Sequence, residues 1–155
     1  MKLIRASNGK LLFHLSKREK HLLIEVLKLY PRILPAHQPL SKSLKVPNRE
    51  ANQHLLDEAL AEQRAEGKKH LRAFLADEQR FEEDQTGWRL SLAASEPEWL
   101  LQILNDIRVG SWISLGSPEP PLEIKLLNAK TAPDFWAMEM AGHFQVQLIA
   151  AMEGR

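Results

Sequence analysis

The spacing of hydrophobic positions along the chain predicts a mainly helical α+β protein with a small amount of sheet. Apolar residues recur at helical spacing in four stretches, at about 17–30, 48–81, 96–114 and 132–152. The first fifteen residues differ, because they hold two short apolar runs on either side of Asn8-Gly9. Both of these residues tolerate the positive φ angles of a two-residue hairpin turn, so this stretch predicts a β-hairpin.

A third strand is predicted near 88–92, where large residues alternate with small or polar ones. A hairpin alone is only marginally stable, and a third antiparallel strand would support it. Together these elements predict a single domain, 1–155, built as a compact bundle of four to five helices with an N-terminal hairpin. A chain of 155 residues is large enough to fold on its own core without a metal or a disulfide.

The starts of two helices carry a recognisable pattern. Ser16 and Glu19 have the spacing of a capping box, and so do Ser95 and Glu98. In this arrangement the hydroxyl and the carboxylate each satisfy a backbone N–H that the first helical turn leaves unpaired. We therefore predict helix starts at about 17 and 96.

The long segment 48–81 is helical in composition, but its apolar stripe fades around Gly67 and returns at Leu71. A break or a bend at Gly67 would explain the gap, so the segment is predicted to be either two helices or one bent helix. The acidic run 82–84 that follows is predicted to be a loop. The proline-marked stretch 31–47 is also predicted to be a loop.

The last helix is apolar nearly all round, which is typical of a helix that is buried or shared with a partner. We expect it to pack against Gly110 and Ser114, small residues that permit close approach. The alternative is that it forms a homo-oligomer contact.

The helix at 96–114 is interrupted by a polar group made up of Asn105, Asp106, Arg108 and Trp112. Such a group can be a functional site, or it can satisfy nearby backbone groups and charges. Arg108 lies one turn before Trp112, so its guanidinium could rest on the indole while it bonds a carboxylate.

The same helix carries a resemblance to a known family. Its motif consists of Trp99, Leu100, Leu104, Asn105, Asp106, Ile107, Arg108, Leu115 and Gly116. This motif resembles that of the bacterial family called domain of unknown function 2017, although Trp112 and Ser114 stand where that family often has glycine and a second arginine. The resemblance implies two roles, because relatives tend to be encoded beside the adaptor of the Clp protease and are sometimes labelled transcriptional regulators.

Charge is unevenly distributed, although the net charge is only +1. Residues 1–50 hold eleven Lys and Arg against three Asp and Glu. A candidate interaction face on the first helix comprises Lys17, Lys20, His21, Ile24, Lys28 and Arg32. This face could contact phosphates or an acidic partner, although a solvated face is the commoner explanation.

The residues point to no catalytic motif, and no cofactor or metal is expected. The chain has no cysteine and therefore no disulfide or thiol nucleophile. Glu139 and His143 are spaced i, i+4, but a metal site needs a further ligand that the spacing does not supply. No signal peptide or membrane segment is predicted, which indicates a cytoplasmic protein.

Our first hypothesis is therefore a non-enzymatic regulatory or protein-interaction protein with an unidentified protein partner. The alternative is a nucleic-acid-binding transcriptional regulator that uses the basic N-terminal third. Catalysis by a dispersed set such as Asp106, Arg108 and His143 ranks third, because nothing in these residues selects a reaction.

Overall fold

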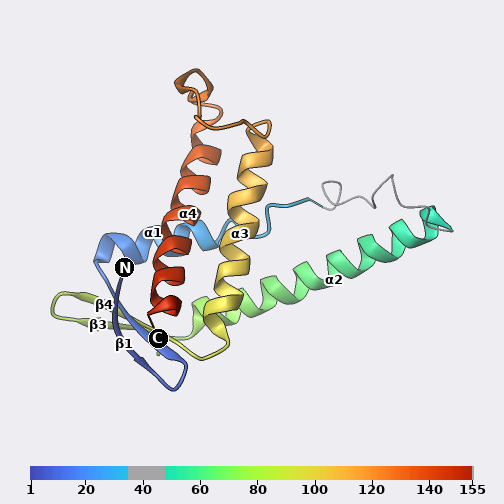
Figure 1. The fold of residues 1–155 in the computed structure, drawn as a ribbon. Helices are drawn as coiled ribbons and strands as arrows, with labels where there is room; N and C mark the ends of the chain where they lie inside the picture. Colours follow the sequence, from blue (N-terminus) through green and yellow to red (C-terminus); the bar gives the residue numbers. More distant parts are fainter. Residues whose placement is uncertain (35–47, 155) are drawn as a thin grey trace.

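The structure is a computed structural model that describes residues 1–34 and 48–154. Within these ranges it contains four α-helices and four strands, which confirms the predicted α+β class with a helical majority (Figure 1). In chain order the elements are β1 (Lys2–Ser7), β2 (Lys10–Leu15), α1 (Lys17–Leu27), α2 (Arg49–Ala76), β3 (Phe81–Asp84), β4 (Gly87–Leu92), α3 (Glu96–Ser114), the short 3₁₀ helix η2 (Ile124–Leu126) and α4 (Ala132–Glu153). Most of the predicted 31–47 loop lies outside the described residues. A search of the described helices finds none with the length and apolar character needed to span a membrane.

The four strands form one antiparallel sheet in the order β1-β2-β4-β3. The predicted hairpin is confirmed, with Asn8 and Gly9 both at positive φ, 51° and 75°. The predicted third strand is also confirmed, because β4 pairs with β2. One face of the sheet contributes Leu11, Phe13, Leu15, Leu90 and Leu92 to the core.

The prediction of an acidic loop at 82–84 is wrong, because these residues belong to strand β3. The strand is held by pairing with β4 and by Phe81, whose ring meets that of Phe74 edge-on at 6.4 Å between centroids. Asp84 helps to close the turn into β4 by accepting a hydrogen bond from the Thr86 N–H at 2.8 Å. The acidic side chains of Glu82 and Glu83 lie on an exposed edge strand, where charge is tolerated and opposes unwanted strand pairing.

Helices α3 and α4 lie side by side, and α1 packs against both (Figure 1). The expected contact of α4 with Gly110 and Ser114 is wrong, however. Gly110 is approached by the backbone of Arg32, in the segment after α1: a Cβ at Gly110 would lie 2.6 Å from the Arg32 carbonyl carbon. Ser114 is exposed and donates a hydrogen bond to the Gly110 carbonyl at 3.1 Å. The close approach was predicted correctly, but its partner was not.

Helix α2 is a single continuous helix that projects away from the other helices (Figure 1). Its buried residues are Leu71 and Phe74, near its C-terminal end, so the predicted compact bundle does not include its N-terminal half. Of the two predicted alternatives, the structure has one helix and not two. Gly67 instead lets Tyr30 lie directly on the helix, because a Cβ there would come within 2.5 Å of the Tyr30 hydroxyl oxygen.

The capping box at Ser16 and Glu19 is confirmed, with both of its hydrogen bonds present. The one predicted at Ser95 is wrong, although the helix bounds 96–114 are right. The Ser95 side chain makes no capping hydrogen bond, and the Ala93 N–H donates instead to the carboxylate of Glu96 at 2.6 Å. Helix α1 also ends earlier than predicted, at Leu27, because the next residues form tighter turns.

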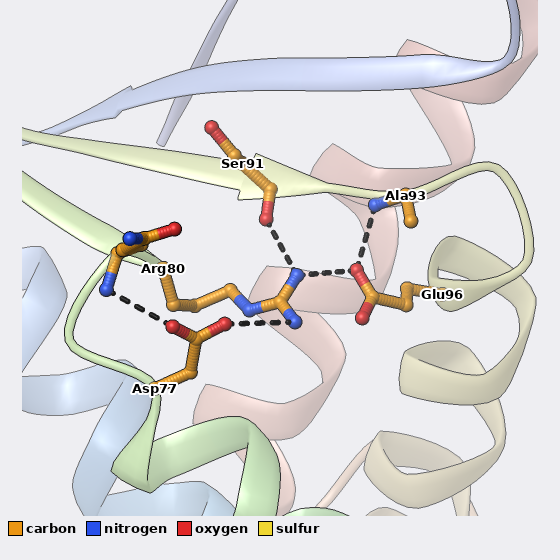
Figure 2. Close-up of polar contacts among 6 residues, drawn as sticks. Asp77, Arg80, Ser91, Ala93 and Glu96 are labelled. Atoms are coloured by element: carbon orange, nitrogen blue, oxygen red, sulfur yellow. Dashed lines mark hydrogen bonds and ion pairs between the residues drawn. The ribbon is translucent and has the colours of Figure 1, made fainter.

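Arg80 ties three elements together beside this helix start (Figure 2). Its guanidinium donates to the Glu96 carboxylate at 2.5 Å and to the Ser91 carbonyl at 2.9 Å, and lies 3.5 Å from the Asp77 carboxylate. It also covers the ring of Phe74 at 4.6 Å. These contacts fix the end of α2 and strand β4 to the first turn of α3.

Candidate functional site

A groove of about 790 Å³ lies between α2 and α3. Tyr30 and Ile33, from the segment after α1, complete its lining. The groove contains two members of the predicted polar group, Asn105 and Asp106. We therefore treat the α2/α3 groove as the candidate functional site.

Asp106 holds the segment after α1 against this groove. Its Oδ1 accepts hydrogen bonds from the backbone N–H of Arg32 at 2.6 Å and of Ile33 at 3.3 Å. The Arg32 guanidinium then donates to the Ser111 hydroxyl at 2.9 Å and pairs with Asp134 of α4 at 3.0 Å. Asp106 thus has a structural role: it satisfies two backbone donors where the chain crosses α3.

Replacing Asp106 with asparagine should lower the free energy of unfolding by about 1.5 kcal/mol, because a charged acceptor for two backbone donors becomes neutral. Replacing the exposed Asn105 with alanine is the control and should cost less than about 0.5 kcal/mol. Denaturant unfolding of the two variants measures both effects. Equal losses would contradict the structural role of Asp106.

Tyr30 lines the groove together with Asp106 and Arg64. Burial raises the pKa of its phenol above the ordinary value of 10.0, and the negative charge of Asp106 raises it further. The positive charge of Arg64 acts in the opposite direction. The hydroxyl therefore lies within the electrostatic field of both charges.

Because Tyr30 is the one tyrosine of the chain, its titration can be followed directly by the ultraviolet absorbance of the phenolate. The neutral phenol is favoured in the folded protein, so the midpoint should lie above 10.0. Arg64→Gln should raise the midpoint further, whereas Asp106→Asn should lower it. Shifts of the same sign in both variants would show that the two charges do not flank the hydroxyl.

An aromatic platform forms another part of the groove. His70 of α2 stacks on Trp99 of α3 with 4.1 Å between ring centroids and 24° between planes. Phe74 supports Trp99 from within the core at 5.4 Å. The groove thus combines a polar region around Tyr30 with a flat aromatic surface.

The other two members of the predicted polar group, Arg108 and Trp112, have different hydrogen-bond partners. Arg108 donates to the Asn105 side chain at 3.3 Å. The Trp112 indole N–H donates to the Pro118 carbonyl at 2.9 Å. We predicted that the Arg108 guanidinium rests on the Trp112 indole. In the structure each of the two side chains instead bonds a partner of its own.

The predicted basic face is partly occupied by internal contacts. The Lys20 ammonium lies 3.0 Å from the centre of the Trp88 ring, and burial lowers its pKa while Glu83 opposes that shift. Lys28 pairs with Glu25 of the same helix at 2.9 Å. These two lysines are therefore less available to a partner than the sequence suggests.

The remaining members of that face are distributed differently from the prediction. Lys17 and His21 are exposed on α1, but Ile24, which we expected to be exposed, is half-buried. Arg32 lies beyond the end of α1, where its guanidinium contacts α3 and α4. The structure does not gather these six residues into one surface.

Glu139 and His143 lie exposed on α4. The His143 ring contacts the Gln147 amide at 2.8 Å. Across residues 1–34 and 48–154, no group of three His, Asp or Glu side chains is placed to hold a metal ion.

The sequence did not predict four residues of the groove as site residues: Tyr30, Arg64, His70 and Trp99. Trp99 was named in the family motif but was not assigned to a site. Arg64, Gly67 and His70 are spaced by three residues, which puts them on one side of α2. A glycine flanked in this way is a signal for close approach by another segment. The identity of that segment, however, depends on the fold.

Comparisons with known protein families, with curated protein sequences and with solved structures found no match. The resemblance to domain of unknown function 2017 therefore stays a prediction.

Proposed function

We propose that this chain is a cytoplasmic, non-enzymatic regulatory or protein-interaction protein, and that the α2/α3 groove is its docking face. The observation that carries the proposal is the groove itself, which is open, mixed in polarity and formed between a projecting helix and the core. Grooves between helices are a common means of binding a segment of a partner protein.

Exposed apolar side chains give further support. Leu55 of α2 is 61% exposed, and Leu60 lies in the lining of the groove. Exposed large apolar side chains are a feature of protein interaction surfaces. They supply contact area that the isolated chain leaves in water.

Affinity capture from a lysate of the native host, at low salt and with nuclease, tests the proposal. Gln102 lines the groove, whereas Gln85 lies exposed in the turn between β3 and β4. We expect Gln102→Trp, which places a bulky ring in the groove lining, to lose a partner that both the wild type and Gln85→Trp retain. Retention of every partner by Gln102→Trp would remove the groove as the docking face.

A component of the Clp protease system is the first partner to test in purified form, because of the family resemblance of the central helix. Direct binding that depends on Gln102 would support that link. Binding unaffected by Gln102→Trp would assign the contact to another surface.

The alternative of a homo-oligomer through α4 is supported by three exposed side chains on that helix. Val146 is 68% exposed, Ile149 is 43% exposed and Trp136 is 36% exposed. Light scattering at several protein concentrations gives the oligomeric state. A monomer at all concentrations would remove this alternative.

Nucleic-acid binding is the second candidate function, and one observation favours it. Lys2, Arg5 and Lys10 are exposed on the N-terminal hairpin, and in the described part of the chain none of them forms an ion pair. Binding through phosphates should weaken steeply with salt. Absence of binding to labelled DNA and RNA at low ionic strength would exclude this function.

A further inference from the structure

We propose that the α2/α3 groove recognises an acidic side chain of a partner protein segment, and that Arg64 is the residue that binds its carboxylate. This inference rests on the proposed function, because it specifies the chemistry of the partner that the groove accepts. The observation behind it is the Arg64 side chain, a cation with two nitrogens that have no hydrogen-bond partner in the described residues.

The Arg64 guanidinium lies in the groove lining, and its Nε and Nη1 are buried with no hydrogen-bond partner in residues 1–34 and 48–154. Buried polar groups in folded proteins are nearly always paired, and a charged one without a partner is costly. An arginine fork fits the two oxygens of a carboxylate in one plane. An arriving carboxylate would therefore give this guanidinium a charged partner, which no ion pair among the described residues provides.

The neighbouring acid does not neutralise Arg64. Oδ1 of Asp106 already accepts from two backbone N–H groups, and no ion pair joins Asp106 to Arg64. The Tyr30 hydroxyl lies under the influence of both charges. Tyr30 lines the same groove as Arg64 and carries a hydroxyl donor for an incoming acidic group.

The rest of the groove favours a peptide segment over a small anion. Glu66 and Lys69 are both exposed lining residues of opposite charge, so they offset one another, and Asp106 is the remaining charged lining residue beside Arg64. A volume of about 790 Å³ far exceeds that of one carboxylate. The stacked rings of His70 and Trp99 offer an apolar surface for a neighbouring side chain of the same segment.

A random peptide library displayed on phage provides the probe, with the full chain as bait. We expect the selected peptides to be enriched in Asp and Glu. Synthetic copies should lose affinity when these residues are changed to Asn and Gln. Selection of peptides without acidic residues, or no selection at all, would overturn the inference.

The selected peptides are then titrated against two variants of α2. Arg64→Gln should weaken binding by about tenfold, which corresponds to the loss of one charge-assisted contact. The control Arg72→Gln removes an exposed arginine of the same helix and should change affinity by less than about twofold. Equal losses in both variants would indicate general charge attraction and would contradict a specific role for Arg64.

The melting temperature separates a binding role from a structural one. Since Arg64 is unpaired in the free protein, Arg64→Gln should melt at the same temperature as the wild type or higher. A lower melting temperature would mean that Arg64 stabilises the fold and would count against the inference. Displacement of the peptides by inorganic phosphate or free glutarate, lost in Arg64→Gln, would assign the site to a small anion instead.

Failure of this inference can be distinguished from failure of the proposed function. If Gln102→Trp loses a partner but Arg64→Gln does not, the groove is a docking face without acidic specificity. If neither variant loses a partner, both proposals are wrong.

Discussion

Replacing Glu96 with glutamine is expected to lower the free energy of unfolding by about 3 kcal/mol, the largest effect predicted for a single residue of this chain. The Glu96 carboxylate receives both the Arg80 guanidinium and the Ala93 N–H (Figure 2). The two charged side chains are only 15% and 12% exposed. Removing one charge of such a pair leaves the other poorly solvated and without compensation.

The remaining carboxylate near Arg80 does not replace Glu96. Asp77 is 3.5 Å away, and its side chain is 43% exposed, so solvent screens that interaction. The loss should therefore appear in full in denaturant unfolding.

Glu98→Gln is the matched control, because Glu98 lies in the same first turn of α3 but is exposed. Both changes remove one negative charge from a helix N-terminus, so the helix-dipole contribution is similar in the two variants. We expect Glu98→Gln to cost less than about 1 kcal/mol. A similar loss in both variants would show that the buried pair with Arg80 contributes little.

Replacing Gly110 with alanine should destabilise the protein by about 2 to 3 kcal/mol through overpacking. Its added methyl group would lie 2.6 Å from the carbonyl carbon and 2.6 Å from the Cβ of Arg32. The Arg32 backbone cannot move away freely, because Asp106 and Asp134 hold this residue in place. Ordinarily the same exchange in a helix interior is stabilising.

Gly142→Ala gives that ordinary outcome and is the control. A methyl group there would meet the Arg108 side chain at 3.6 Å, a normal contact distance. We expect Gly142→Ala to raise the free energy of unfolding by about 0.5 to 1 kcal/mol. Effects of the same sign at Gly110 and Gly142 would contradict the close approach of Arg32.

Local patterns in the sequence predicted the elements that local physics determines. The Asn8-Gly9 turn and the Ser16 capping box were identified because their hydrogen bonds and φ angles depend on neighbouring residues only. The bounds of the helix at 96–114 were predicted for the same reason, although the Ser95 capping box was not formed. Its place was taken by Glu96, whose partner Arg80 lies in the turn between α2 and β3.

Features that depend on distant residues could not be predicted in this way. Strand β3 contains a run of acidic residues and is ordered by its pairing with β4. Gly67 resembles a helix breaker until Tyr30 is seen to lie on it. Arg64 resembles an ordinary exposed arginine until the groove encloses two of its nitrogens.

Site-specific photocrosslinking tests the central claim, that the α2/α3 groove is a docking face, most directly. A photoreactive phenylalanine analogue is placed at Gln102 in the groove, or at Gln85 in the β3–β4 turn, and each protein is irradiated in a lysate of the native host. The structure predicts a discrete adduct from Gln102 that is absent from Gln85. Equal adducts from both positions, or none from Gln102, would contradict the claim.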